Sequence, residues 1–157
     1  MDIRKAAKGD CRVIAELALI AGEGIPAYFW EQEQAGEPDL LTVGARKAGS
    51  ETDNFSYRNT HLALIDDHIA GMVLAYRLPE SDRDDDSDGL PDFIHPLLEL
   101  ERRVPGSFYV NMLAVYPRYR GRGVGTALMG RVERLAAAVG CATVSVQVFE
   151  QNGGALR

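Results

Sequence analysis

One stretch of the chain carries most of the structural information, and it reads Asn111-Met112-Leu113-Ala114-Val115-Tyr116-Pro117-Arg118-Tyr119-Arg120-Gly121-Arg122-Gly123-Val124-Gly125-Thr126-Ala127-Leu128. Its first part completes a strand over residues 107–115 that is apolar on both faces, as expected of a central strand. Strict alternation places Phe108, Val110, Met112 and Ala114 on one face and Tyr109, Asn111, Leu113 and Val115 on the other. Its last part opens a long helix with apolar residues at helical spacing, which Gly140 ends.

The turn between this strand and this helix is rich in glycine and arginine. The glycines keep side chains clear of the helix start, where unpaired backbone N–H groups and the positive end of the helix dipole lie. Such a turn favours an oxygen-rich anion, above all a phosphate. Three arginines surround the turn in an otherwise acidic chain and strengthen this prediction: Arg118, Arg120 and Arg122.

Three phosphate-binding patterns compete for this turn. A nucleotide P-loop needs a lysine after its last glycine, and none follows here, which disfavours NTP hydrolysis. A dinucleotide fingerprint needs a third glycine where Thr126 stands, and the acidic ribose-binding residue about 20 residues further on is missing as well. The pattern [Q/R]-x-x-G-x-[G/A] fits, because Arg120, Gly123 and Gly125 match it directly after the strand and the Tyr-Pro turn.

In this context, residues 111–128 resemble the acetyl-CoA loop of the GNAT superfamily of N-acetyltransferases. Further along, Gln151-Asn152-Gly153-Gly154-Ala155 looks like the N-x-x-A start of the next helix in that family. The resemblance implies the GNAT fold, of mixed α/β (α+β) class. This fold has a central mixed, mostly antiparallel sheet with flanking helices and a splayed pair of parallel strands.

The remaining predicted elements fall in the order of this family. A strand over residues 2–6 precedes three helices, one capped by Asp10, one opening at Ile25 with Pro26 in its first turn, and one over residues 39–48. Residues 62–65 and 69–78 read as a hairpin around a polar turn. A short helix over residues 92–104 should be broken near Pro96. A strand over residues 143–149 should lie parallel to the strand over 107–115 after a right-handed crossover.

Length and composition limit what the chain can be. Its 157 residues, 46% of them apolar, suit a single domain over residues 1–157 with one real core. Lys and Arg number 17 against 23 Asp and Glu, for a net charge of −6, which argues against a general binder of nucleic acid or anionic membranes.

The cysteines and the terminal segments indicate the compartment. Cys11 and Cys141 belong to no CxxC or Cys/His cluster, so neither a disulfide framework nor a metal site is predicted. No signal peptide and no apolar run of membrane length is visible, so we expect a cytoplasmic protein. Residues 79–91 should form an acidic surface insertion, which either keeps the protein soluble or attracts a cationic amine.

The resemblance implies acetyl-CoA as cosubstrate. Main-chain groups of Leu113, Ala114 and Val115 would pair with the pantetheine arm, in the gap where their strand splays from residues 143–149. The pyrophosphate would bind the amides of Arg120, Gly121, Arg122, Gly123, Val124, Gly125 and Thr126. Asn152 matches a family residue that contacts the cofactor arm, and an ordinary helix N-cap is an equally good interpretation.

The implied reaction moves the acetyl group of acetyl-CoA to a primary amine by direct attack in a ternary complex. The oxyanion that forms needs a donor, for which the resemblance suggests the backbone N–H near Leu113. Many family members carry a glutamate base on the central strand, where this chain has Tyr109 and Asn111. Candidates for the base are therefore Glu99 and Glu101 on the preceding segment, or Tyr109 itself, and a solvated helix face is the other interpretation of the two glutamates.

The acceptor and the partners are less determined. Tyr28 and Phe29 either pack in the core or, with Asn111, contact the substrate, which could be a small amine, an antibiotic or a peptide. The tyrosine that protonates the thiolate in this family would follow Arg157, and the last pair of family strands is missing, so we expect the natural chain to be longer. A homodimer is expected from the resemblance. The alternatives are a non-catalytic acyl-CoA sensor of the same fold and, less favoured, a dinucleotide-dependent oxidoreductase.

Overall fold

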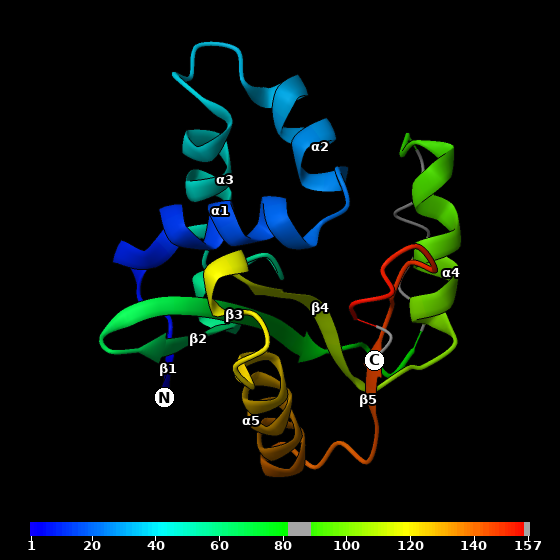
Figure 1. The fold of residues 1–157 in the computed structure, drawn as a ribbon. Helices are drawn as coiled ribbons and strands as arrows, with labels where there is room; N and C mark the ends of the chain where they lie inside the picture. The colour runs from blue at the N-terminus through cyan, green and yellow to red at the C-terminus, as the bar shows by residue number, and fades with distance from the viewer. Residues whose placement is uncertain (82–88, 156–157) are drawn as a thin grey trace.

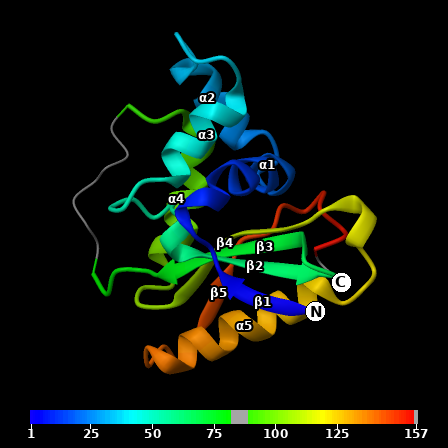
Figure 2. The ribbon, with the colours of Figure 1, turned by 90° about the vertical axis from the view of Figure 1, so that its left-hand side faces the viewer.

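The computed structural model describes residues 1–81 and 89–155 and places one mixed sheet between two layers of helices (Figures 1 and 2). The strands are β1 (Asp2–Lys5), β2 (Thr60–Ile65), β3 (His68–Arg77), β4 (Phe108–Val115) and β5 (Val144–Val146). The helices are α1 (Cys11–Ala21), α2 (Ile25–Glu33), α3 (Leu40–Ala48), α4 (His95–Arg102) and α5 (Val124–Ala138). Four short 3₁₀ turns are η1 (Lys8–Asp10), η2 (Tyr57–Asn59), η3 (Asp92–Ile94) and η4 (Pro117–Tyr119).

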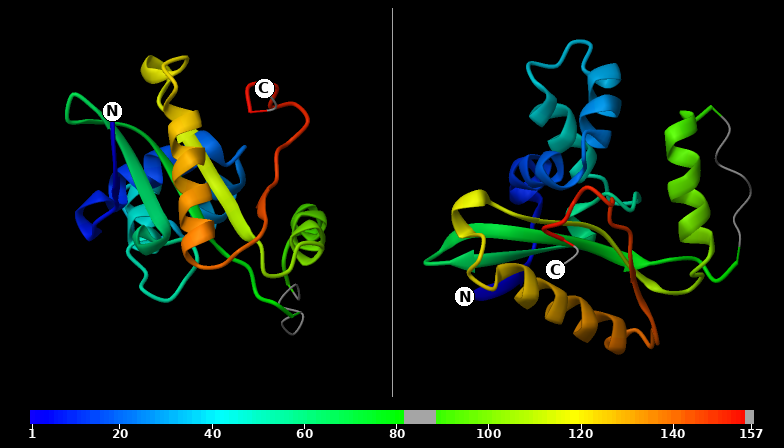
Figure 3. Two further views of the ribbon diagram at one scale, coloured as in Figure 1. Left: turned by 90° about the horizontal axis from the view of Figure 1, so that it is seen from below. Right: turned by 45° about the vertical axis from the view of Figure 1, so that its right-hand side comes forward.

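The five strands follow one another in the order β1-β2-β3-β4-β5. The first four are antiparallel neighbours, and β5 joins β4 in parallel through the crossover helix α5. Helices α1 and α3 pack on one face of the sheet and α5 on the other, while α4 stands beside β5 (Figures 1 and 3). The predicted mixed, mostly antiparallel sheet with one parallel pair is confirmed.

The hairpin of β2 and β3 turns at Asp66 and Asp67, which have φ values of 49° and 62°. Two successive residues with positive φ form the type I′ turn, whose twist matches that of the strands, and aspartate tolerates this conformation better than most residues. The predicted hairpin is thus confirmed.

A bulge in β4 overturns the predicted alternation of its side chains. Leu74 of β3 lies opposite Met112 and the next residue, Ala75, lies opposite Val110, so Asn111 has no partner across this pair. An extra residue in one strand shifts the side chains that follow to the other face. Phe108 and Val110 therefore pack against α5, whereas Met112 and Ala114 pack on the side of α1.

The parallel pair at the edge of the sheet is short. Only Phe108–Val110 of β4 pairs with Val144–Val146 of β5, and the strand predicted to reach Phe149 ends earlier. At the paired end, the hydroxyls of Ser107 and Ser145 lie 2.7 Å apart. The chain separates from β4 beyond the bulge (Figure 3). The splayed strand pair is confirmed in this form.

Two local predictions are corrected, and a third falls partly outside the described residues. Pro96 lies in the first turn of α4 and does not break the helix, since its missing N–H has no intrahelical acceptor there. Residues 152–155 form a hydrogen-bonded turn where a helix was expected. Of the predicted insertion at 79–91, residues 82–88 lie outside the described residues.

Within the described ranges, no helix is both long and apolar enough to cross a bilayer.

The helical layer packs closely at Gly44 of α3. A Cβ atom at this position would lie 2.4 Å from the Trp30 ring and 2.7 Å from the Cβ of Ala15. Both neighbours are buried, at 3% and 0% exposure, and cannot move away at low cost.

We expect Gly44→Ala to lower the free energy of unfolding by about 1–3 kcal/mol, because overpacking outweighs the gain of about 1 kcal/mol in helix propensity. Urea denaturation measures this change. Gly9→Ala is the matched control, since a Cβ there meets nothing within 4 Å, and it should change stability by less than about 0.5 kcal/mol. Equal midpoints for the two variants would contradict the packing described here.

His61 of β2 is a buried titratable group, 7% exposed. Its Nε2 lies 3.4 Å from a guanidinium nitrogen of Arg131, which can only donate, so this ring nitrogen accepts and the ring is neutral. Burial, and then the positive charges of Arg131 and Lys5, lower the pKa of His61 from 6.5 to about 4.

We expect His61 to make the protein less stable in acid. The unfolded chain binds a proton at His61 below pH 6.5 and the folded chain only near pH 4, so stability is lost as the pH falls through this window. Between pH 7 and pH 5 the loss should be about 1–2 kcal/mol, and His61→Gln should remove it. The exposed His68 offers the control His68→Gln, which should keep the wild-type pH slope in denaturant titrations. An unchanged slope in His61→Gln would refute the assignment.

Candidate active site

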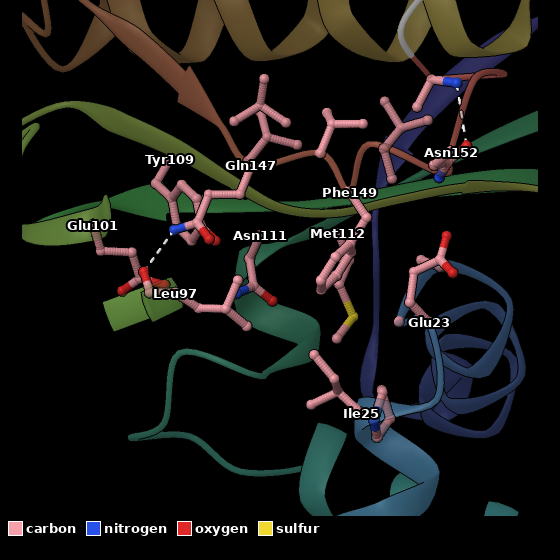
Figure 4. Close-up of a pocket in the computed structure, with 18 of the residues that line it drawn as sticks. Glu23, Ile25, Leu97, Glu101, Tyr109, Asn111, Met112, Gln147, Phe149 and Asn152 are labelled. Carbon is pink, nitrogen blue, oxygen red and sulfur yellow. Dashed lines mark hydrogen bonds between the residues drawn. The ribbon is translucent and has the colours of Figure 1, made fainter. Parts of the chain in front are cut away.

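A pocket of about 730 Å³ opens where β4 and β5 separate (Figure 4). Its walls come from the end of α1, the start of α2, α4 with the turn before it, β4, the start of α5 and the chain after β5. The gap connects the side of the sheet that α5 covers with the side of α2 and α4. The bulge at Asn111 lies where the gap begins, and Asn111 lines the pocket.

One end of the pocket is formed by the first turn of α5. Gly123, with φ 77°, precedes the helix, and no side chain caps it. The first turn of a helix presents amides with no intrahelical acceptor and the positive end of the helix dipole. Gly125 and Thr126 line the pocket here, and a Cβ on Gly125 would still be 3.9 Å from the Leu113 side chain. This end suits a phosphate-like anion.

The edge of β4 that faces the pocket has free main-chain groups. The N–H of Tyr116 donates to the carbonyl of Ala70 in β3, at 2.9 Å. Because residues along a strand alternate in the edge to which they point, Ala114 faces β3, and Leu113 and Val115 face the open edge. No strand within the described residues pairs with this edge beyond Val110. The carbonyl of Val115 accepts from Nε of Arg120, at 3.2 Å, so the groups left for pairing at this edge are both main-chain groups of Leu113 and the N–H of Val115.

The other residues predicted to bind the cofactor divide into core and surface positions. The side chains of Ala114 and Val124 are buried at 3% and 2% exposure, so only their main chains can reach a ligand. Arg118 lies over the rings of Tyr116 and Tyr119, at 5.3 and 5.0 Å from the centroids. Arg122 lies 5.7 Å from the Tyr119 ring, and none of the three arginines lines the pocket. Arg118 and Arg122 therefore stack on the same Tyr119 ring, in the segment that leads into α5.

Asn152, in the chain after β5, also lines the pocket (Figure 4). Its side-chain oxygen accepts a hydrogen bond from the N–H of Ala155, at 3.2 Å. The side chain of Asn152 therefore acts as a cap, as one of the two interpretations expected, but the element that it caps is a turn and not a helix.

The other end of the pocket contains a half-buried carboxylate. Glu101 of α4 lies beside Tyr109 of β4 (Figure 4). Burial raises the pKa of Glu101, and a hydrogen bond from Tyr109 partly offsets this rise. Burial also raises the pKa of Tyr109, as do the charge and the hydrogen bond of Glu101, so the phenol keeps its proton. Tyr76 packs edge-to-face on Tyr109, with 5.8 Å between the ring centroids.

This carboxylate is suited to accept a proton. A base works best when its pKa approaches the working pH, and burial moves Glu101 in that direction. Asn111 lies near Tyr76 and Tyr109, where its amide partly offsets the rise in the pKa of both phenols. A cation that enters here meets one carboxylate in a mostly apolar wall.

Some predicted substrate and catalytic residues lie outside the pocket lining. Glu99 is exposed and does not line it, which fits the solvated-face interpretation for this residue. Tyr28 is 43% exposed and so is not a core residue. Together with Phe29 and Phe93 it forms an edge-to-face aromatic cluster, with 5.2 Å between the Tyr28 and Phe93 centroids, next to the pocket residues Pro26 and Ile94.

Sequence reasoning missed the apolar wall and two polar residues of the pocket. Leu97 and Leu98 belong to α4, and Gln147 follows β5, where its amide donates to the carbonyl of Leu97 at 2.9 Å and ties the two walls together (Figure 4). Glu23 lines the pocket from the turn before α2, with a φ of 50°. Gly24 in the sequence could indicate a turn with positive φ at this place. The sequence does not show that this turn lies at the pocket.

Metal ligands do not gather in the part of the chain that the structure describes. No group of three His, Cys, Asp or Glu side chains is placed there to hold an ion, and Cys11 and Cys141 are both free.

The comparisons with known proteins agree with this geometry. The model of the acetyltransferase (GNAT) family matches residues 25–157, and the chain belongs to this family. A search of curated proteins finds no match.

Solved structures of similar fold cover nearly the whole chain. An acetyltransferase crystal structure is 23% identical, covers 99% of this chain and 85% of its own, and has a TM-score of 0.69. An N-acetyltransferase from Staphylococcus aureus Mu50 is 20% identical, with coverage of 99% and 86% and a TM-score of 0.63. The aminoglycoside N-acetyltransferase AAC(6')-Iy in complex with CoA is 16% identical, with coverage of 99% and 84% and a TM-score of 0.52.

Proposed function

We propose that this protein transfers the acetyl group of acetyl-CoA to a primary amine, by direct attack within a ternary complex. The observation that carries the proposal is the pocket itself. It joins an uncapped helix start suited to a diphosphate with a half-buried carboxylate suited to an amine, through a gap in the sheet. Membership of the GNAT acetyltransferase family and the CoA complex of a protein of similar fold support it.

The residues of this chain fit coenzyme A in two places. The amides at the start of α5, over Gly123 to Thr126, would bind the diphosphate, and Arg118 and Arg122 lie in the segment just before them. Leu113, on the open edge of β4, would pair with the amides of the pantetheine arm, as an added strand does. Acetyl-CoA would supply the activated acyl group, and the N–H of Leu113 would stabilise negative charge on its carbonyl oxygen.

Glu101 is the residue of this chain that we assign to the amine. An amine with a pKa above neutrality arrives as an ammonium ion, and it must lose a proton before its nitrogen can attack. Glu101 would bind the ammonium ion, take that proton and pass it to solvent. As the nitrogen bonds to the acyl carbon and the carbon–sulfur bond breaks, the nitrogen would lose a second proton and the departing thiolate would take up one, so that the products are the N-acetylamine and CoA thiol. Tyr109, which lies beside Glu101 in the pocket lining, would help to orient the carboxylate.

Amine-dependent release of CoA thiol tests this proposal. We expect purified protein with acetyl-CoA to release thiol when a primary amine is added, together with an equal amount of acetylated amine. Reactions without amine and with a tertiary amine, which offers no N–H, are the controls. Binding of CoA without amine-dependent turnover would instead favour the non-catalytic sensor, a candidate raised by the uncharged Tyr109 and Asn111 on β4.

A further inference from the structure

The side of the pocket at α2 and α4 is apolar. Ile25 and Pro26 line it from the start of α2, Leu97 and Leu98 from α4, and Ile94 from the turn before α4. Figure 4 shows the side chains of Ile25, Leu97 and Met112 pointing into the same space. A molecule bound here must place hydrocarbon against these walls, because they offer it no hydrogen-bonding groups.

The charges around this space are few. Among the described residues, the charged side chains that line the pocket are Glu23 and Glu101, and no lysine, arginine or histidine is among them. Glu23 is exposed, whereas Glu101 is half-buried on the α4 wall. The side of the pocket at α2 and α4 therefore provides one half-buried charged partner for a cation and no charged partner for an anion.

This balance discriminates between classes of amine. A second ammonium group held between the apolar side chains would leave water without a partner there, which is costly. The other carboxylate of the lining, Glu23, is exposed and does not belong to these apolar walls. A carboxylate next to the amine, as in an amino acid, would also lack a partner and would be repelled by Glu101. A single amine on a hydrocarbon body meets neither penalty.

The aromatic cluster continues the apolar wall toward the surface. Tyr28 and Phe93, on α2 and η3, are 43% and 47% exposed, although both carry large apolar rings. Their edge-to-face contact, at 5.2 Å between centroids, bridges the two elements that form this side of the pocket. Exposed aromatic side chains beside an apolar pocket are typical of a hydrophobic ligand site.

We propose that the acceptor is a primary monoamine with a hydrophobic body, whose ammonium group binds beside Glu101 while its body packs between α2 and α4. This inference rests on the proposed function, since it assigns to the acceptor the side of the pocket that coenzyme A would leave free. Polyamines, aminoglycosides and amino acids are poor acceptors on this account.

Two matched pairs of amines test the inference. Hexylamine and hexamethylenediamine differ by one amine, and phenethylamine and phenylalanine differ by one carboxylate. We expect each monoamine to have a kcat/KM at least about 10-fold higher than its partner. The reason is that burying a charge without a partner costs more free energy than a 10-fold change in kcat/KM represents. From propylamine to hexylamine, kcat/KM should rise about two- to fourfold per methylene, as burial of hydrocarbon requires.

A pair of variants on α4 locates the selectivity. Leu97→Glu adds a second carboxylate to the apolar wall and should reduce the preference for hexylamine over hexamethylenediamine by about 10-fold. Leu100→Glu is the control, because Leu100 lies on the same helix, is 45% exposed and does not line the pocket. It should keep the wild-type preference. Equal preferences in the two variants would overturn the placement of the acceptor.

Calorimetric binding of the same amines to the protein with CoA separates the two proposals. If amines are acetylated but the diamine or the amino acid is preferred, the inference is wrong and the proposed function stands. If no amine is acetylated, the proposed function fails, and the affinities of the amines then test the inference about the acceptor. Tighter binding of the monoamines would then support it, and equal or reversed affinities would overturn it.

Discussion

Replacement of Glu101 by glutamine should lower kcat/KM for amine acetylation by about 100- to 1000-fold, the contribution typical of a positioned general base. Glutamine keeps the shape of the side chain and can still accept from Tyr109, but it cannot take a proton from the amine. Affinity for CoA should stay within about twofold, because the carboxylate lies on the acceptor side of the pocket. Steady-state kinetics and calorimetry measure the two effects.

The matched control for this variant is Glu99→Gln. Glu99 lies on the same helix, is exposed and does not line the pocket, so the variant should keep wild-type activity. Equal activities of the two variants would show that Glu101 is not the base.

The pH profile provides a second readout of the same residue. Burial raises the pKa of Glu101 above the ordinary value of 4.5, so the acidic limb of kcat/KM should have its midpoint above that value. Activity should fall as the pH drops through this midpoint, because the carboxylate becomes protonated. Glu101→Gln should lose this limb.

Replacement of Gly125 by glutamate should weaken CoA binding at least about 100-fold, equivalent to about 2.7 kcal/mol. Gly125 lies in the first turn of α5 and lines the pocket, so the new side chain brings bulk and negative charge to the place assigned to the diphosphate. The backbone should tolerate the change, since a Cβ at Gly125 would be 3.9 Å from its nearest neighbour. Calorimetric titration with CoA measures the effect.

Gly130→Glu is the matched control for charge and helix. Gly130 belongs to α5 but does not line the pocket, and a Cβ there would be 3.8 Å from the guanidinium of Arg134. This variant should bind CoA with wild-type affinity, and both variants should unfold no earlier than wild type, because glutamate favours a helix more than glycine does. Wild-type affinity in Gly125→Glu would refute the assignment of the helix start to the diphosphate.

The sequence could predict the elements whose signals are local. The glycine turn, the period of α5 and the polar turn at Asp66 and Asp67 each determine a short piece of backbone. The resemblance in residues 111–128 then supplied the order of the strands. These signals were enough for the mixed sheet and its parallel pair, because few topologies join such elements.

The rest of the site depends on tertiary geometry that no local pattern shows. The bulge at Asn111 moves the side chains on one side of it to the other face of the sheet. It is visible only in the pairing of β4 with β3, which lies far away in the sequence. Glu99 and Glu101 are equivalent in sequence, and only the packing of α4 beside β4 buries one and exposes the other. The apolar wall at Leu97 is an amphipathic face whose partner is set by the fold.

A crystal structure of the protein with coenzyme A would show whether the pocket binds this cosubstrate as proposed. We expect the diphosphate on the amides at the start of α5, the pantetheine arm along the open edge of β4 at Leu113, and the sulfur atom in the gap between β4 and β5, facing Glu101. Coenzyme A bound at another surface, with this gap filled by the protein's own side chains, would contradict it.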